Sequence, residues 1–161
     1  DCDRIADFHV RMWRQTYEDM APESAVRALN FGRRQGQWRA KLSGDHDHTL
    51  TLVAEDEQGR ILGLCDMARP ETSEFSDTME LTNLYVDNTV RGLGIGRHFL
   101  RLAQHWARVS GASDLVLAVV LQNDSALDFY RACGGIPVAK SLDKGPLWRS
   151  DNVIMRWPSA E

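Results

Sequence analysis

Apolar side chains recur every three or four positions at the start of the chain, a spacing that predicts a helix with one buried face. Asp3 is a suitable N-cap, and the helix is expected to run to about Met20. Two shorter helical stretches follow, one from "APES" to Leu29 and one over residues 37–42. Because the chain enters this pattern almost at once, the sequence leaves open whether a first strand belongs before it. The spacing of the first helix is kept by Ile5, Phe8, His9, Met12, Trp13 and Tyr17.

Alternating apolar and polar positions then predict a hairpin of two strands, "TLTLVAE" and "ILGLCDMAR", joined by the turn "DEQGR". Gly63 inside the second strand predicts a bulge or a close backbone approach. The order of elements predicts an α/β fold, in which helices flank a mixed, mostly antiparallel sheet in one domain over residues 1–161. The later elements are predicted as a strand at 78–87, a helix at 94–110, a strand at 114–120, a helix at 123–133 and strands at 136–142 and 151–157.

Charge, hydropathy and cysteine content indicate which partners and which cellular location to expect. The 161 residues carry a formal net charge of −4, which argues against nucleic acid as the main partner. No apolar run approaches the roughly 20 residues of a membrane span, so no membrane partner is expected. Cys2, Cys65 and Cys133 are an odd number of cysteines without CxxC spacing, which favours reduced thiols and a cytoplasmic location.

The loop "RGLGIGR", from Arg91 to Arg97, joins a predicted strand to a predicted helix. Amides at a helix start have no partner inside the helix and carry the positive end of its dipole, so they suit a phosphate. Glycine at 92, 94 and 96 removes side chains that would hold a phosphate away. Neither the Walker pattern nor the dinucleotide GxGxxG pattern matches. Taken alone, the loop fits a diphosphate cradle or a tight turn without a ligand.

Two motifs at a fixed spacing favour the cradle. "RGLGIG" fits an acyl-CoA motif that requires Arg or Gln, two free positions, Gly, one free position and then Gly or Ala; the strand before it ends in "LYV", Leu84–Val86. "NDSALDFYRACG", from Asn123 to Gly134, matches the second signature NxxAxxFYxxxG. In these two motifs and in its order of elements, the chain resembles the GNAT superfamily of N-acetyltransferases. Asn88, where many relatives have proline, is a departure from the family pattern.

The resemblance implies acetyl-CoA as cosubstrate, with its diphosphate on the backbone amides of residues 93–97. It also implies that the strand edge at 84–86 pairs with the pantetheine arm in a slot opened by a bulge, and that an amide near Val86 polarises the thioester carbonyl. Asn123 would line the other wall, and Tyr130 would stand near the sulfur. The expected cosubstrate-binding residues are Leu84, Tyr85, Val86, Arg91, Gly92, Leu93, Gly94, Ile95, Gly96, Arg97, Asn123, Ala126 and Tyr130.

Acetyl transfer to an amine needs a neutral amine, and an alkyl amine with a pKa near 10 is neutral in about one molecule per thousand at pH 7. A general base therefore helps. Glu80, on the strand ahead of the loop, is the candidate base, acting through water; it could also bind the amine or simply be solvated. Its side chain is expected to share a face with Thr82 and Leu84. The weaker candidates for the base are Asp87, Asp77 and His9.

Tyr130 is the candidate general acid for the departing thiolate, and its alternative role is aromatic packing beside Phe129. No covalent intermediate on Cys133 is expected, and no metal is expected, since "DHDH" at residues 45–48 fits a solvated turn. Trp13, Tyr17, Trp38 and Trp148 are further candidates for contact with the substrate. Trp13 and Tyr17 share a helical face, as core residues usually do, although the resemblance places the first helix and the last loop beside the acceptor groove.

The leading hypothesis is acetylation of a small-molecule primary amine by direct attack in a ternary complex. A polyamine, an amino acid and an aminoglycoside all stay open as acceptors. The alternatives are acetylation of protein N-termini or lysines, and a module that senses acyl-CoA without turnover. A homodimer is expected by family analogy alone.

Overall fold

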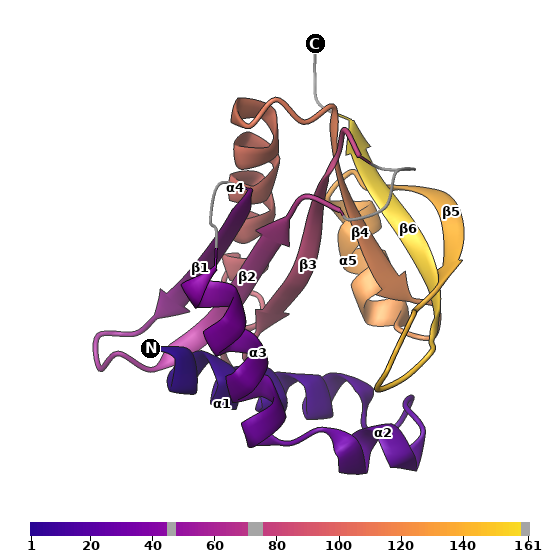
Figure 1. Ribbon diagram of the computed structural model, residues 1–161. Helices are drawn as coiled ribbons and strands as arrows, with labels where there is room; N and C mark the ends of the chain where they lie inside the picture. Colours follow the sequence, from indigo (N-terminus) through magenta and orange to yellow (C-terminus); the bar gives the residue numbers. More distant parts are fainter. Residues whose placement is uncertain (45–47, 71–75, 159–161) are drawn as a thin grey trace.

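The computed structural model of the chain describes residues 1–44, 48–70 and 76–158 and places six strands in one sheet with helices on both faces (Figure 1). The helices are α1 (Cys2–Tyr17), α2 (Glu23–Ala28), α3 (Phe31–Ser43), α4 (Ile95–Val109) and α5 (Asp124–Ala132), with a short 3-10 helix, η2, at Asn88–Val90. The strands are β1 (Thr49–Glu55), β2 (Ile61–Ala68), β3 (Met79–Val86), β4 (Asp114–Val120), β5 (Ile136–Leu142) and β6 (Asp151–Pro158). The predicted mixed, mostly antiparallel sheet is confirmed.

The sheet divides between β3 and β4. Its strand order is β1-β2-β3-β4-β6-β5, and every neighbouring pair is antiparallel except β3 and β4. Those two parallel strands pair only at Met79 with Leu115 and at Glu80 with Val116. Both strands continue for several residues beyond that point, so they diverge toward their carboxyl ends (Figure 1).

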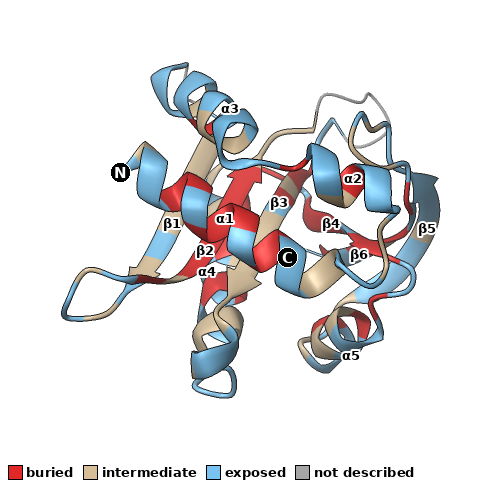
Figure 2. Ribbon diagram, turned by 90° about the horizontal axis from the view of Figure 1, so that it is seen from below, coloured by how far each residue is buried: buried red, intermediate tan, exposed pale blue. Residues whose placement is uncertain are grey.

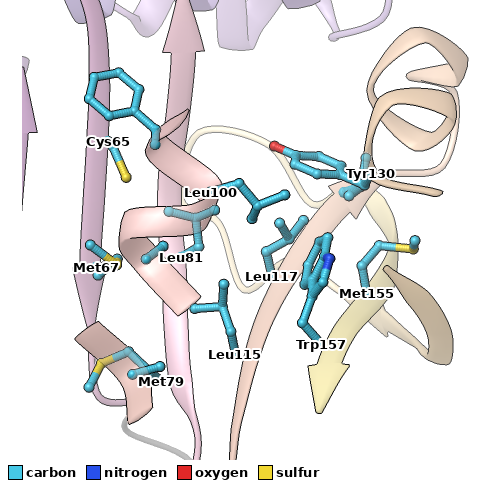
Figure 3. Close-up of a cluster of buried hydrophobic side chains, with 14 of the residues drawn as sticks. Cys65, Met67, Met79, Leu81, Leu100, Leu115, Leu117, Tyr130, Met155 and Trp157 are labelled. Carbon is cyan, nitrogen blue, oxygen red and sulfur yellow. The ribbon is translucent and has the colours of Figure 1, made fainter. Parts of the chain in front are cut away.

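Each face of the sheet has its own core. On one face α4 and α5 enclose a large cluster that includes Cys65, Leu81, Leu117, Tyr130 and Met155 (Figure 3). On the other face α1 lies across β2 and β3 with its buried side toward the strands, and α3 packs against α1 (Figure 2).

A third cluster joins the end of α1 to the other half of the sheet. Val10 and Trp13 of α1 pack with Ala25 and Leu29, and Tyr17, Leu147 and Trp148 lie against them. Leu147 and Trp148 belong to the connection between β5 and β6. The C-terminal end of α1 therefore lies on the face of the sheet opposite α4, beside the last loop.

A β-bulge interrupts β3 just after it leaves β4. Asn83 pairs with Asp66 and Leu81 pairs with Met67, so Thr82 is the extra residue on β3. The extra residue reverses the alternation of side chains, and Leu84 packs into the same cluster as Leu81. The expectation that Glu80, Thr82 and Leu84 share one face is therefore wrong for Leu84. The bulge that the family resemblance implied is present.

Candidate active site

The glycine loop leads directly into α4. Gly94 is the N-cap, with φ of 85°. Because glycine has no side chain, it does not cap the amides that follow. The first helical bond runs from the amide of His98 to the carbonyl of Gly94, at 2.9 Å. The amides of residues 95–97 precede that bond, and within the described residues no acceptor is found for them. This helix start therefore offers a set of parallel donors that have no acceptor in the described part of the chain.

The glycines of the loop do not all serve one purpose. A Cβ at Gly92 or Gly94 would meet no atom within 4 Å, and both have positive φ, so they keep open the space in front of the helix. A Cβ at Gly96 would lie 3.2 Å from Cζ of Phe129. Gly96 thus permits close packing of α4 on α5 rather than approach of a phosphate, which corrects the expectation from sequence.

The side chains around the loop are open to solvent. Arg91 and Arg97 are exposed on either side of it, and Leu93 is 74% exposed. The amide of Leu93 contacts the carbonyl of Val90 at 3.5 Å, so it is less available than the amides that follow. Ile95 instead packs on the core beneath α4.

The predicted strand edge at residues 84–86 lies within the divergent part of β3. Its backbone pairs with β2 on one side and has no partner in β4 on the other. Leu84 packs toward α4, Tyr85 packs toward α1, and Val86 lies beside Gly96. An extended ligand can add to this edge in the way that a β-strand would.

Asn123 connects the two sides of the slot. Its side-chain Oδ1 caps α5 by accepting from the amide of Ala126 at 3.2 Å. The side chain also hydrogen-bonds the hydroxyl of Tyr17, and Tyr85 donates to the same hydroxyl. Tyr17 on α1 thus bridges β3 to the start of α5, a contact that the sequence signal at Tyr17 did not predict.

Tyr130 is buried on α5 at the edge of the large cluster. The centroids of the Tyr130 and Trp157 rings are 5.7 Å apart, and the Tyr130 hydroxyl points away from α5 toward β3 (Figure 3). Burial raises the pKa of the Tyr130 phenol above its ordinary value, and the nearby Tyr17 and Cys65 raise it further. The phenol is therefore protonated at neutral pH and can donate a hydrogen bond.

Glu80 sits at the last position where β3 pairs with β4. It is half-buried, and because side chains alternate along a strand, it lies on the face opposite Met79 and Leu81. Glu80 and Tyr130 therefore approach the slot from opposite faces of the sheet.

Two of the weaker candidates for the base, His9 and Asp87, are poorly suited. Burial, followed by the charges of Arg34 and Lys41, lowers the pKa of His9 to about 3, and Nδ1 of His9 accepts from Nε1 of Trp38 at 3.1 Å. Hydrogen bonds from the backbone and hydroxyl of Thr89 lower the pKa of Asp87. Both groups resist protonation at neutral pH, which argues against a role as base.

Asp66 is a residue of this region that the sequence analysis missed. It is 1% exposed on β2, and it pairs with Lys41 of α3. Thr51 donates to its Oδ1 at 2.8 Å, and the bulge residue Thr82 donates to its Oδ2 at 2.6 Å. In the sequence, a single acidic residue within the otherwise apolar strand "ILGLCDMA" is the feature that could have pointed to Asp66. The carboxylate holds the bulge in place by its hydrogen bond to Thr82.

Comparison with known proteins identifies the family. The family model described as "Acetyltransferase (GNAT) family" matches residues 7–135. The chain belongs to the GNAT family of acetyltransferases. It is therefore an acyltransferase, and the resemblance inferred from the two motifs is confirmed.

One relative and two solved structures illustrate the similarity. The uncharacterized N-acetyltransferase YuaI of Bacillus subtilis is 27% identical over 98% of this chain and 88% of its own. The structure of yncA from Salmonella typhimurium, solved with acetyl-CoA, superposes with a TM-score of 0.72 at 22% identity over 100% of this chain and 90% of its own. The paia N-acetyltransferase from Thermoplasma acidophilum, in complex with coenzyme A, has a TM-score of 0.69 at 16% identity over 98% of this chain and 92% of its own. At these identities the structures establish the GNAT fold.

Two expectations fall at the limits of the described residues. Positions 45–47 of the "DHDH" segment lie outside them, and His48 is exposed. In the parts of the chain that are described, no group of three His, Cys, Asp or Glu side chains could hold a metal ion. None of the described helices has the length and apolar character required to cross a membrane.

Proposed function

We propose that this GNAT enzyme transfers the acetyl group of acetyl-CoA to a primary amine of a small molecule, by direct attack in a ternary complex. The observation that carries the proposal is the divergence of β3 from β4 after Glu80, with the unpaired backbone amides of residues 95–97 at the open end of the slot. Two neighbours of the same fold, yncA and the paia enzyme, were solved with acetyl-CoA and coenzyme A, which supports the same cosubstrate here.

In this proposal the diphosphate of acetyl-CoA lies against the amides of residues 95–97, flanked by Arg91 and Arg97. Amide donors and the helix dipole both favour negative charge at this point. The pantetheine arm runs along the free edge of β3 at residues 84–86, with Asn123 and Ala126 on the opposite wall. The amide near Val86 polarises the thioester carbonyl and stabilises the negative charge that develops on its oxygen.

The chemical step is a nucleophilic addition followed by loss of the thiolate. The neutral amine nitrogen attacks the carbonyl carbon, and a proton leaves the nitrogen toward Glu80 through water. The carbon–sulfur bond then breaks, and the electron pair stays on the sulfur. Tyr130 donates its hydroxyl hydrogen to that thiolate. Because burial raises the pKa of Tyr130, this donation is best written as a strong hydrogen bond that stabilises the leaving group, with protonation completed from solvent.

The test is to mix the protein with acetyl-CoA and separate panels of small amines and peptides while following free thiol, with an amine-free control for the protein's own cysteines. We expect amine-dependent thiol release with a small amine. Faster release with peptides would support the protein N-acetyltransferase alternative. Binding of acetyl-CoA without release for any amine would support the non-catalytic sensor and contradict the proposal.

The cytoplasmic location and the homodimer are also part of this proposal. Cys2, Cys65 and Cys133 are free thiols, which is compatible with a reducing compartment. The homodimer rests on family analogy, and light scattering of the purified protein tests it directly.

A further inference from the structure

Arg34, in the first turns of α3, holds a buried polar atom without a partner. Its Nε is the one buried side-chain nitrogen or oxygen that lacks a hydrogen-bond partner among the described residues. At the other end of the guanidinium, Nη1 donates to Oε1 of Gln37 at 2.9 Å. No carboxylate of the described chain forms an ion pair with Arg34. A buried donor left unpaired costs free energy, so this arrangement calls for an explanation.

Arg34 lies beside the slot, on the face opposite α4. Tyr85 and His9 both interact electrostatically with its charge. The ring centroids of His9 and Tyr85 are 5.3 Å apart, and Tyr85 hydrogen-bonds Tyr17 at the end of α1. This is the side from which an acceptor reaches a thioester held along β3, because α4 and α5 cover the other face.

The two cations of α3 that lie near His9 differ in their partners. Lys41, a second cation of α3, is neutralised by the buried carboxylate of Asp66. Arg33 is exposed and adds positive charge, while burial is the main cause that lowers the pKa of Arg34. Burial lowers the pKa of His9, so its imidazole is neutral and adds no charge beside Arg34. Of these two cations of α3, Arg34 is the one whose guanidinium forms no ion pair within the described residues, while Glu80 is the acid on the same face of β3.

We infer that the acceptor amine carries a carboxylate, and that the guanidinium of Arg34 binds it; this rests on the proposed function and names its class of acceptor. The substrate class is that of amino acids. A carboxylate presents two oxygens that match the donor fork of a guanidinium, and a charge-assisted bond of this kind satisfies the buried Nε. A polyamine would bring a second cation next to Arg34 and Arg33, which like-charge repulsion disfavours.

The experiment compares matched acceptors in the thiol-release assay: a panel of L-amino acids, the same amino acids as carboxamides, and spermidine. We expect at least one amino acid to have kcat/KM about tenfold or more above that of its amide, with spermidine slower still. In Arg34→Gln, kcat/KM for that amino acid should fall on the order of 100-fold, mainly through KM, while the amide is little affected.

Arg33→Gln is the matched control, since it removes an exposed cation of the same turn and should preserve the preference for the acid. Acetyl-CoA affinity, measured by calorimetry, should be unchanged in both variants and shows that each is folded. The inference is overturned if amides or spermidine react as well as the acids, if Arg34→Gln keeps the preference, or if acetyl-CoA binds and no amino acid is acetylated. Absence of acetyl-CoA binding to the native protein would instead overturn the proposed function.

Discussion

At the scale of single residues, burial decides which side chains keep their protons at neutral pH. It raises the pKa values of the phenols of Tyr17, Tyr85 and Tyr130, so all three are neutral hydrogen-bonding groups. It also raises the pKa of the Cys65 thiol to about 12, with Asp66 as a further cause, so this thiol is unreactive at neutral pH. The slot therefore contains neutral donors rather than phenolates or thiolates.

Tyr130→Phe removes one oxygen and preserves the ring that packs on Trp157. If the hydroxyl stabilises the leaving thiolate, kcat should fall about 10- to 100-fold while the affinity for acetyl-CoA changes by less than about twofold. Steady-state kinetics with calorimetric titration measure the two separately. A native kcat throughout the accessible pH range would show that Tyr130 only packs in the core.

His9 makes the stability of the folded protein depend on pH. Its pKa is about 3 in the folded state, against an ordinary value of 6.5 for a solvated histidine, so below pH 6.5 the unfolded chain binds a proton that the folded protein does not. This contribution to stability is full above pH 6.5 and is lost as the pH falls toward 3, with about 2 kcal/mol lost by pH 5.

His9→Gln tests this dependence, because glutamine retains an acceptor for Nε1 of Trp38 and does not titrate. Chemical denaturation between about pH 7 and pH 5 should show a smaller loss of unfolding free energy in this variant than in the native protein. Equal slopes for the two proteins would mean that His9 ionises normally in the folded state.

At the scale of elements, the sequence predicted nearly all helices and strands but not their irregularities. Helices α4 and α5 were predicted, because Gly111, which follows α4 with a positive φ, and Asn123, which caps α5, act through local backbone geometry. The third helix was predicted only at 37–42, yet α3 begins at Phe31, since Gly32 and Gly36 weaken its pattern. Gly63 was expected to mark a bulge or a close backbone approach, and a Cβ there would lie 2.7 Å from the side chain of Phe99.

The bulge of β3 was placed by family resemblance, and its side-chain consequences were not predictable from alternation. Which residue is extra depends on pairing with β2 and on the buried carboxylate of Asp66, both of which are non-local. The hydrogen bonds of Asp66 and the unpartnered Nε of Arg34 were missed for the same reason. Single-sequence patterns report neighbours along the chain, whereas these residues are defined by contacts across elements.

Thr82→Val should loosen the bulge, since valine has the shape of threonine without the hydroxyl that bonds Asp66 at 2.6 Å. We expect a loss of about 1–3 kcal/mol in unfolding free energy and roughly tenfold weaker acetyl-CoA binding, because the free edge at residues 84–86 shifts. Denaturation and calorimetry measure these two effects.

Two controls separate positioning from general stability. Thr82→Ser keeps the hydroxyl and should restore acetyl-CoA affinity. Thr51 lies on β1, away from the slot, and also donates a hydrogen bond to Asp66. Thr51→Val should therefore lower stability and leave the affinity for acetyl-CoA unchanged. If Thr51→Val and Thr82→Val weaken acetyl-CoA binding equally, the bulge has no specific part in binding.

At the scale of the whole molecule, the sheet is two antiparallel halves joined at two paired positions of β3 and β4. Helices α4 and α5 cover one face across the join, and α1 reaches across the other through Tyr17. The free edge of β3 and the start of α4 therefore lie at one end of the join between β3 and β4. The two motifs of the sequence lie on the two walls of that opening, where the proposed function places acetyl-CoA.

A matched pair of glycine variants tests the proposed binding of the acetyl-CoA diphosphate at the start of α4. Gly94 and Gly111 flank the same helix, have φ of 85° and 74°, and have open space around a would-be Cβ. Valine at either position should cost about 1–3 kcal/mol of stability through backbone strain.

Calorimetric titration of acetyl-CoA into the native protein, Gly94→Val and Gly111→Val is the deciding measurement. We expect Gly94→Val to weaken binding by at least about 100-fold, because the valine side chain would take the place of the phosphates, and Gly111→Val to bind as the native protein does. Native affinity in Gly94→Val, or an equal loss in both variants, would contradict this proposal.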